Sequence, residues 1–435
     1  MRQLVAWLND SSVGVITEEN DIWSFEYDEA WMTSPDGFDL APALPRTDRR
    51  HRDGSTSRPV QWYLDNLLPE EKLRETLVKS AQLKGDDAFS LLAYLGAESA
   101  GSLVLLPPGE PPSREGGLKP LPDAELCGRI RNMERVPLSE GAPKRMSLAG
   151  AQNKLAVVFK EGQLFEPVGH EPSTHILKPN HPSEDYPGSV INEYVTMKLA
   201  DGLGLPVPAV HRLYTPEPVY LVERFDRWQD PQGRTHRTHI IDTCQLLNKG
   251  RSFKQSSATV EALADAANAC DNKLATRVRV FAWLLFCVLV ANDDNHLKNL
   301  SYRIGPQGIA LAPHYDLLST GTYHTRALAD DRGAWPSVRM MYALGRAEVF
   351  GQVTMEHLRM AAEALGLPQA VCSRIVMQMT NRILTALDAL IESVAAENGR
   401  SASRVDPVFA AQEDRVLRSM RHIVVPHMVN RVRQD

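Results

Sequence analysis

An apolar run of 12 residues at positions 280–291 is the feature that most limits how this chain of 435 residues can fold. The run is shorter than the ~20 apolar residues that a helix needs to cross a bilayer, so it predicts a helix buried in a protein core. Polar and charged residues follow it directly at 292–299, in the order NDDNHLKN. A buried helix would hold these chemically active side chains rigidly at its end.

The composition predicts a globular protein without a membrane-spanning segment. Hydrophobic residues make up 43% and charged residues 23%, which excludes wholesale disorder, a collagen-like fibre and a membrane bundle. The 48 basic and 54 acidic side chains give a net charge of −6, so nucleic-acid contact would need a local patch. The five cysteines form no C-x-x-C pair and predict buried thiols in the cytoplasm.

The distribution of residue types predicts several compact units. Alternating apolar and polar residues at 4–8 and 22–27 predict a small β element. The stretch 107–122 holds six Pro and three Gly among 16 residues, which predicts a linker that forms neither helix nor strand. We expect an N-terminal subdomain over 1–106, a linker over 107–122, a β-rich lobe over 123–225 with a helix at 189–202, and a mainly helical lobe over 226–435.

Beyond the apolar run, two short strands are predicted at 300–304 and 309–312 around a Gly-Pro-Gln-Gly turn. This hairpin would return Asp316 to the side of Asp294 and Asn299. Phosphoryl transfer needs a carboxylate at the attacking hydroxyl, a carboxylate and an amide oxygen on Mg²⁺, and an amine on the phosphates. Asp294 and Asn299 have the spacing of Asp and Asn in the kinase catalytic loop. Each fragment alone fits a capped helix end or a turn, but their ordered combination favours a kinase-type site.

Upstream segments supply candidate partners for a nucleotide. A strand at 174–179 places Lys178 near its end, where its amine could contact phosphates, and Glu193 on the following helix could pair with it. A turn of small residues at 146–154 could lay backbone N–H groups on phosphates, although it matches neither glycine-rich consensus. The strand at 219–227 could offer backbone groups to an adenine edge. The alternative for 146–154 is an ordinary hairpin turn, and the alternative for 219–227 is an ordinary strand without a ligand.

A metal-dependent hydrolase remains an alternative to phosphoryl transfer. Clusters of Asp and His also build two-metal sites. The candidate ligands are Asp293, Asp294, His296, His314 and Asp316. Such a site would leave Lys178 and the small-residue turn without a role.

Five ordered motifs resemble the HipA family of serine/threonine kinase toxins. They are SLAGAQNK at 147–154, HILKP at 175–179, VERFDR at 222–227, DNHLKN at 294–299 and YDLLS at 315–319. The segments LVAWLNDSSVGVI at 4–16 and LDNLLPE at 64–70 also resemble the N-terminal domain of that family. The resemblance implies an α+β, protein-kinase-like two-lobed fold, with a small N-terminal α/β subdomain and a large helical C-terminal lobe.

The resemblance also implies a role for each matching residue. Asp294 would be the catalytic base, and Asn299 and Asp316 would hold Mg²⁺. Ser147 would be autophosphorylated, which in this family expels the nucleotide loop and silences the kinase. Residues in four places are expected to contact ATP. They are Ala149, Gly150, Ala151, Gln152, Asn153 and Lys154 in the nucleotide loop; Lys178 at the phosphates; Glu223, Arg224 and Phe225 in the adenine hinge; and His296, Leu297, Lys298, Asn299, Tyr315 and Asp316 in the rest of the ATP pocket. Asp293 competes for the role of base, but only Asp294 has the kinase spacing to Asn299.

The family implies two protein partners. The expected substrate is an aminoacyl-tRNA synthetase, and the expected regulator is a DNA-binding antitoxin of HipB type whose dimer bridges two toxin chains and contacts the DNA. Two alternatives stay open: a co-repressor subunit with little catalysis, and a phosphotransferase that acts on a small molecule. The first would use C-terminal arginines to neutralise phosphates, although a solvated helix face is the commoner explanation. These arginines are Arg415, Arg418, Arg421, Arg431 and Arg433.

Overall fold

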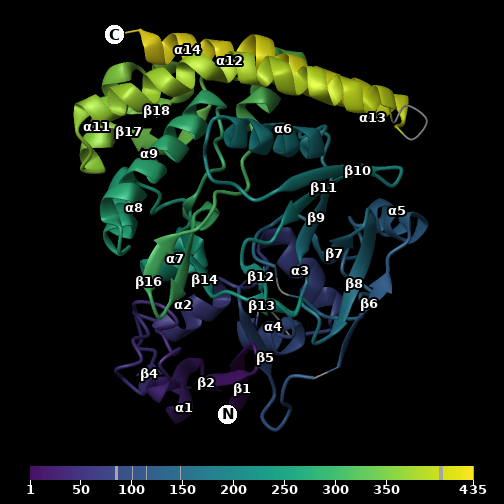
Figure 1. The fold of residues 1–435 in the computed structure, drawn as a ribbon, viewed down its shortest axis with the longest axis vertical. Helices are drawn as coiled ribbons and strands as arrows, with labels where there is room; N and C mark the ends of the chain where they lie inside the picture. The colour runs from purple at the N-terminus through teal and green to yellow at the C-terminus, as the bar shows by residue number, and fades with distance from the viewer. Residues whose placement is uncertain (84–86, 100, 114, 147, 401–404, 435) are drawn as a thin grey trace. The chain divides into compact units, whose positions relative to one another are not determined.

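The computed structural model describes residues 1–83, 87–99, 101–113, 115–146, 148–400 and 405–434, which divide into two compact units (Figure 1). The first unit comprises Met1–Lys178, Glu223–Lys254 and Ser301–Ala312. The second comprises Pro179–Val222, Gln255–Leu300 and Pro313–Asp435. The motifs are therefore divided: the nucleotide-loop, lysine and hinge motifs lie mainly in the first unit, and the DNHLKN and YDLLS motifs lie in the second.

The first unit begins with an antiparallel sheet in the strand order β4-β3-β2-β1-β5. Its strands are β1 (Arg2–Leu8), β2 (Ser11–Glu19), β3 (Ile22–Tyr27), β4 (Arg50–Arg52) and β5 (Leu103–Leu106). Leu4, Ala6 and Leu8 are buried and alternate with less buried neighbours, which confirms the strand predicted at 4–8. Short helices complete this part: α1 (Glu29–Thr33), α2 (Pro59–Asp65), α3 (Glu71–Ser80) and α4 (Ala88–Leu95).

A second set of antiparallel strands in this unit corrects the predicted linker. The strands β6 (Gly116–Pro120), β8 (Gln163–Gly169), β7 (Leu155–Lys160) and β9 (His175–Pro179) are neighbours in that order. The expectation that 107–122 forms no strand is wrong, because β6 lies within it. Strand β6 is at the sheet edge and largely exposed, and an edge position tolerates proline and glycine since one side of the strand needs no partner.

The rest of the first unit consists of short elements. They are α5 (Asp123–Asn132), β12 (Arg227–Gln229), β13 (Thr235–Arg237), β14 (Ile240–Asp242), α7 (Thr243–Leu246), the 3₁₀ turn η1 (Arg251–Phe253), β15 (Ser301–Gly305) and β16 (Gly308–Leu311). Strands β15 and β16 form the predicted hairpin, with Gly305 opposite Gly308. Strand β14 pairs with β15 on the other side, so the hairpin is part of a three-stranded sheet.

The second unit is built around α9 (Lys273–Leu289), which carries most of the apolar run. The Asn272 side chain accepts a hydrogen bond from the backbone N–H of Ala275 and so caps the start of the helix. From Val280 to Ala291 only Ala282 is not fully buried, which confirms the predicted core helix. All five cysteines are buried and unbridged, as predicted. No helix in the described part of the chain has both the length and the apolar character needed to cross a membrane.

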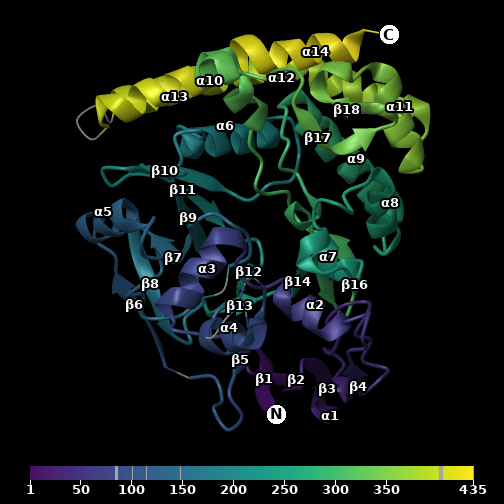
Figure 2. The same cartoon turned by 180° about the vertical axis from the view of Figure 1, so that it is seen from behind.

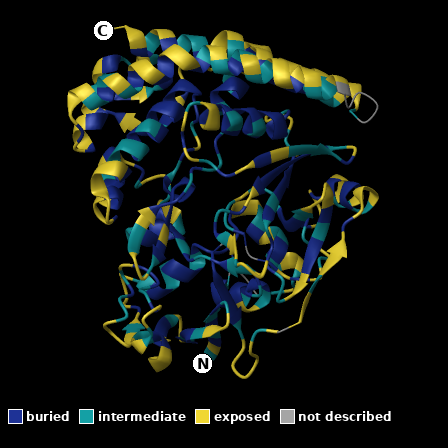
Figure 3. Cartoon of the chain, in the orientation of Figure 1, coloured by how far each residue is buried: buried dark blue, intermediate teal, exposed yellow. Residues whose placement is uncertain are grey.

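Long C-terminal helices cover one side of this core. Helices α12 (Gln369–Arg400) and α13 (Pro407–Ser419) pack against α6 (Ser189–Gly202), which occupies the predicted range, as Figures 1 and 2 show. A π-helical turn, η6 (Met420–Val424), joins α13 to α14 (Val425–Arg433). Buried and exposed residues alternate along these helices in Figure 3. This pattern is typical of amphipathic helices that pack on one face only.

The remaining elements of the second unit are short helices, turns and strands, and two of the strands, β17 and β18, were not predicted. The full set is β10 (Val210–Tyr214), β11 (Pro218–Glu223), α8 (Val260–Asn268), η2 (Leu297–Asn299), η3 (Thr320–His324), α10 (Arg326–Ala329), η4 (Asp330–Arg332), β17 (Arg339–Leu344), β18 (Ala347–Val349), η5 (Phe350–Gln352) and α11 (Met355–Ala364). The hairpin β17–β18 lies in a region expected to be helical. Its turn contains Gly345 at φ +59°, where glycine adopts the left-handed conformation without strain.

Candidate active site

The loop after α9 is held by hydrogen bonds within the second unit. The backbone N–H of Asn292 donates to the Cys287 carbonyl at 2.8 Å, which closes the helix end. The backbone N–H of Asp293 donates to Thr320 Oγ1 at 2.7 Å. Gly321 donates to the Ala291 carbonyl at 2.8 Å, and a Cβ at Gly321 would lie 2.6 Å from the Ala291 side chain. The loop start therefore depends on glycine at 321 for close packing.

Asp294 and Asn299 are joined directly by this loop. The Asn299 Nδ2 group donates to the Asp294 carbonyl oxygen at 2.7 Å, and the Asp294 N–H donates to Asn292 Oδ1 at 3.1 Å. His296 directly precedes the 3₁₀ turn η2, which comprises Leu297, Lys298 and Asn299. The Asn299 N–H donates to the His296 carbonyl at 2.9 Å. Because Nδ2 is used inside the loop, the orientation of the Asn299 amide is fixed.

The segment that contains Tyr315 and Asp316 returns to the same loop. The Tyr315 hydroxyl donates to the Lys298 carbonyl at 2.7 Å. Asp316 has φ +59°, a left-handed conformation that is uncommon outside glycine and sharply changes the chain direction. Burial raises the pKa of the Tyr220 phenol well above its usual value, and the Glu193 and Asp316 carboxylates raise it further. The second unit therefore brings Asp316 and Glu193 into the surroundings of Tyr220, a residue that we did not predict.

The nucleotide loop in the first unit is attached to the start of α3. Gly150 adopts φ +104° and bridges to Pro69, and the Glu70 N–H donates to the Gly150 carbonyl at 3.2 Å. The Lys154 ammonium donates to the Ala149 carbonyl at 2.6 Å, which closes the turn. At this φ an L side chain would be strained, so the position needs glycine for its conformation.

Hydrophobic residues beside Ser147 anchor the same loop. Met146 and Leu148 are each 6% exposed and line a recess together with Pro69 and Leu73. Asn153 donates from Nδ2 to the Met133 carbonyl at 3.4 Å. Ser147 itself, the expected autophosphorylation site, lies outside the described residues. Ala151 and Gln152 continue the turn without regular structure.

Lys178 lies near the end of strand β9, next to the nucleotide loop. Leu155 of β7 is opposite Leu177 of β9, so the register puts Lys178 one position beyond this pair, where the loop enters β7. The side chain of Lys178 is buried. The first unit thus brings the predicted lysine and the predicted loop together. Glu193 belongs to the second unit, and its pairing with Lys178 stays a prediction.

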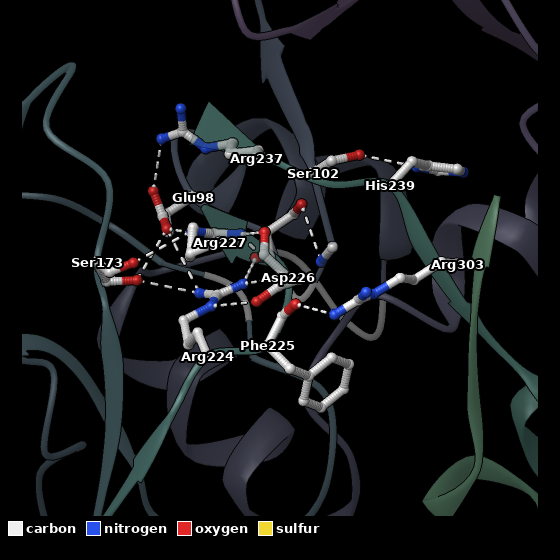
Figure 4. Close-up of polar contacts among 12 residues, drawn as sticks. Glu98, Ser102, Ser173, Arg224, Phe225, Asp226, Arg227, Arg237, His239 and Arg303 are labelled. Atoms are coloured by element: carbon white, nitrogen blue, oxygen red, sulfur yellow. Dashed lines mark hydrogen bonds and ion pairs between the residues drawn. The ribbon is translucent and has the colours of Figure 1, made fainter. Parts of the chain in front are cut away.

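The hinge segment is fixed by both its backbone and its side chains. The Arg224 N–H donates to the Thr174 carbonyl at 2.9 Å, and Arg303 donates from Nη2 to the Phe225 carbonyl at 3.0 Å. The Arg224 guanidinium is directed into a buried cluster with Asp226 and Glu98 (Figure 4). Glu223, at the end of β11, is exposed. The Arg224 side chain therefore supports the hinge from the interior.

Asp293 has a partner that sequence reasoning missed. His324 Nε2 lies 3.3 Å from the Asp293 carboxylate, and this contact raises the pKa of His324. No spacing rule links these two residues, because η3 and the loop are separate along the chain. The contact therefore gives the Asp293 carboxylate a basic partner within the second unit.

Two alternative sites find less support in the geometry. His314, a proposed hydrolase ligand, is buried with its ring stacked on Trp283 at a centroid distance of 6.4 Å, and burial lowers its pKa to about 3.

The C-terminal arginines mostly bind within their own unit, which favours a structural role over a DNA patch. Arg415 donates to the Ala327 carbonyl, Arg418 pairs with Asp414, Arg421 with Asp388, and Arg433 donates to the Thr380 carbonyl.

Comparison with known proteins identifies the family. A model of the HipA N-terminal domain matches residues 4–106, and a model of the HipA-like C-terminal domain matches residues 146–387. The chain is 30% identical over 407 residues to the serine/threonine-protein kinase toxin HipA of Shewanella oneidensis, covering 88% of each chain. It is 34% identical over 339 residues to the candidate kinase Y4mE of Sinorhizobium fredii, covering 74% of this chain and 78% of that protein.

A solved structure agrees with these relatives. The HipA chain in the Shewanella oneidensis complex of HipA, HipB and operator DNA superimposes with a TM-score of 0.77 and 26% identity, covering 98% of this chain and 99% of that one. The expected α+β, kinase-like fold is thereby confirmed. Two family models, relatives along most of the chain and this structural match lead to one conclusion: the chain is a kinase that belongs to the HipA family of serine/threonine kinase toxins.

Proposed function

We propose that this kinase transfers the γ-phosphate of ATP to a serine or threonine hydroxyl of a protein, in a reaction that depends on Mg²⁺. The observation that carries the proposal is the bond between Asn299 and Asp294, because it holds the two residues with kinase spacing in one rigid loop. Asp294 orients the acceptor hydroxyl and accepts its proton. A fixed carboxylate lowers the barrier because little reorganisation is needed when the reaction occurs.

Asn299 and Asp316 are the proposed holders of Mg²⁺. Amide and carboxylate oxygens are ligands that Mg²⁺ prefers, and the bond from Asn299 Nδ2 leaves Oδ1 as the ligand atom of that amide. When bound, the metal would neutralise charge on the phosphate oxygens.

The residues proposed to contact the nucleotide are those of the family motifs. Lys178 contacts the phosphates, the loop from Ala149 to Lys154 covers them, and Glu223 to Phe225 receive the adenine. His296 to Asn299 and Tyr315 are further proposed nucleotide contacts. The support for Lys178 is its place near the end of strand β9, beside the loop. Ser147 is proposed to be autophosphorylated, with loss of the loop contacts as the consequence.

The proposed partners follow from the family. A structural neighbour was solved together with HipB and operator DNA, and we propose that a DNA-binding antitoxin of HipB type binds this chain and provides the DNA contact. An aminoacyl-tRNA synthetase is the proposed protein substrate. The chain would bind DNA mainly through the antitoxin, since four of its five C-terminal arginines are engaged within their own unit.

Calorimetric titration with a non-hydrolysable ATP analogue tests the nucleotide part of the proposal. Lys178→Met should weaken binding by about tenfold or more, because a buried amine on the phosphates is lost. Lys160→Met, at the exposed end of the neighbouring strand, is the matched control and should leave the affinity unchanged. Asn299→Ala should raise the Mg²⁺ concentration needed for tight binding. Wild-type protein that fails to bind the analogue would contradict the proposal.

A further inference from the structure

A fully buried glutamate, Glu98, lies at the centre of a charged cluster in the first unit (Figure 4). Its Oε2 atom accepts hydrogen bonds from Lys144 at 2.8 Å and from Arg237 at 2.9 Å. Its Oε1 atom accepts from Arg227 at 2.7 Å and lies 3.4 Å from Arg224. One carboxylate therefore receives four cationic groups, two on each oxygen.

The cluster carries more positive than negative charge. Lys144 and the three arginines face the two carboxylates of Glu98 and Asp226, which leaves an excess of two positive charges. All six side chains are at most 5% exposed. Burial acts to raise the pKa of Glu98, but the surrounding cations hold it well below its usual range. Without the Glu98 charge, the arginines would repel one another in a site that excludes water.

Glu98 connects two parts of the chain that are distant in sequence. It belongs to the segment 4–106 that matches the HipA N-terminal domain, whereas Arg224 and Arg227 belong to the kinase domain. Arg224 is the middle residue of the proposed adenine hinge. Its Nε and Nη2 groups bind Asp226 at 3.0 and 2.7 Å, and its Nη1 group faces Glu98 and Ser173.

Further bonds hold the segment after the hinge against the same N-terminal domain. The backbone N–H of Arg237 donates to Asn9 Oδ1 at 2.9 Å. His239 lies 2.7 Å from the Ser102 hydroxyl through Nδ1 and 2.8 Å from the Leu40 carbonyl through Nε2. The carbonyl can only accept, so Nε2 carries the proton and Nδ1 accepts from Ser102. The N-terminal domain thus contacts the hinge through Glu98 and also holds the segment that follows the hinge.

We propose that Glu98 is a positioning residue for nucleotide binding, through which the N-terminal domain sets the conformation of the hinge from Glu223 to Phe225. This inference rests on the proposed function, because it assumes that the hinge receives the adenine. Glu98 touches neither nucleotide nor acceptor. It acts through Arg224 and Arg227, whose guanidinium groups each bind the carboxylates of both Glu98 and Asp226.

Glu98→Gln tests the proposal, because glutamine keeps the size of the side chain and removes its charge. The matched control is Glu166→Gln on β8. Glu166 is also fully buried and pairs with Arg129 at 2.6 Å, but its described contacts lie with Lys119 and Arg129, away from the hinge. Both variants should lose stability. Only Glu98→Gln should weaken binding of the ATP analogue and raise the KM for ATP, by about tenfold, with kcat at saturating ATP changed much less.

Hydrogen exchange without nucleotide gives a second readout. Glu98→Gln should speed amide exchange at 224–227 more than in β7 or β8, whereas Glu166→Gln should not.

If both variants weaken ATP binding equally at equal loss of stability, Glu98 is merely structural and the inference is overturned. If wild-type protein binds no ATP analogue, the proposed function fails and the inference falls with it. If wild type binds and Glu98→Gln binds equally well, only the inference fails.

Discussion

The loop at 290–299 and the cluster around Glu98 are both rich in polar and charged side chains, but they are held in opposite ways. Backbone and neutral side-chain hydrogen bonds fix the loop, such as Asn299 to the Asp294 carbonyl and Asp293 N–H to Thr320. Ion pairs between fully buried groups fix the cluster. In the loop, Asp293 keeps a side chain that is 24% exposed. We therefore expect the same residue types to take part in the reaction in one region and to act as structural connections in the other.

This difference predicts which property each substitution should damage. A charge buried with its partners is costly to leave unpaired, so substitutions in the cluster should reduce the free energy of unfolding. The hydrogen bonds that join Asp294 to Asn292 and Asn299 use the backbone of Asp294, so substituting its side chain should damage activity more than stability.

The largest expected effect is on catalysis. Asp294→Asn should lower the rate of phosphate transfer by about 10²–10⁴-fold, because the acceptor hydroxyl loses its base. Binding of the ATP analogue and the unfolding temperature should stay near those of wild type. Asp293→Asn is the control and should reduce the rate less than about tenfold, since Asp293 pairs with His324. A greater loss for Asp293→Asn would move the role of base to that residue.

The second effect is on stability. Glu98→Ala should lower the free energy of unfolding by about 3–5 kcal/mol, because four buried cations lose their carboxylate. Asp388→Ala removes the partner of Arg421 at the surface of the other unit and should cost less than about 1 kcal/mol. Equilibrium urea unfolding measures both. Equal losses would mean that burial does not separate the two kinds of ion pair.

The third effect concerns pH and the buried His239. Burial lowers the pKa of His239 from 6.5 to about 4, so the folded protein favours the neutral ring. Its contribution to stability is fully present above pH 6.5 and is lost as the pH falls toward 4, by about 3 kcal/mol. His239→Gln should flatten the pH dependence of unfolding in this window. The exposed His422→Gln should not, and an unchanged profile in His239→Gln would refute the assignment.

The smallest effect is expected at the pair of His324 and Asp293. Hydrogen bonding to Asp293 raises the pKa of His324, so the contribution of the pair is fully present below pH 6.5 and is lost as the pH rises through the raised pKa. Since the imidazole is 38% exposed and screened by solvent, His324→Gln should cost no more than about 1 kcal/mol. Unfolding at pH 6 and pH 8, with added salt as a control, measures it. A loss that is as large at pH 8 would argue against an ionic contact.

Local patterns predicted much of the fold. The apolar run predicted α9, alternation predicted β1 and β3, and the Gly-Pro-Gln-Gly turn predicted the hairpin of β15 and β16. The errors have physical causes. Strand β6 forms among prolines and glycines because an edge strand needs hydrogen bonds on one side only. Strands β17 and β18 are short, and their glycine turn was overlooked among helical patterns.

In the candidate site too, some residues could be predicted from the sequence, whereas their long-range contacts could not. Asp294 and Asn299 are five positions apart, so their spacing pointed to both residues, although not to the hydrogen bond between them. The partner of Arg224 could not be predicted, because Glu98 is 126 residues away and only the tertiary fold brings them together. The contact of Asp293 with His324 was missed for the same reason. Motifs reveal residues that act on a ligand, whereas long-range packing determines which residues support them.

Transfer of labelled γ-phosphate from Mg²⁺-ATP is the most direct test of the central claim, with wild type and Ser147→Ala compared and labelled residues mapped by mass spectrometry. Intact mass first establishes that the wild-type sample is unphosphorylated at Ser147. The account predicts that wild type labels itself at Ser147, and that Ser147→Ala loses this label yet phosphorylates a protein in a cell extract. Unphosphorylated wild type that labels neither itself nor any extract protein would contradict the account.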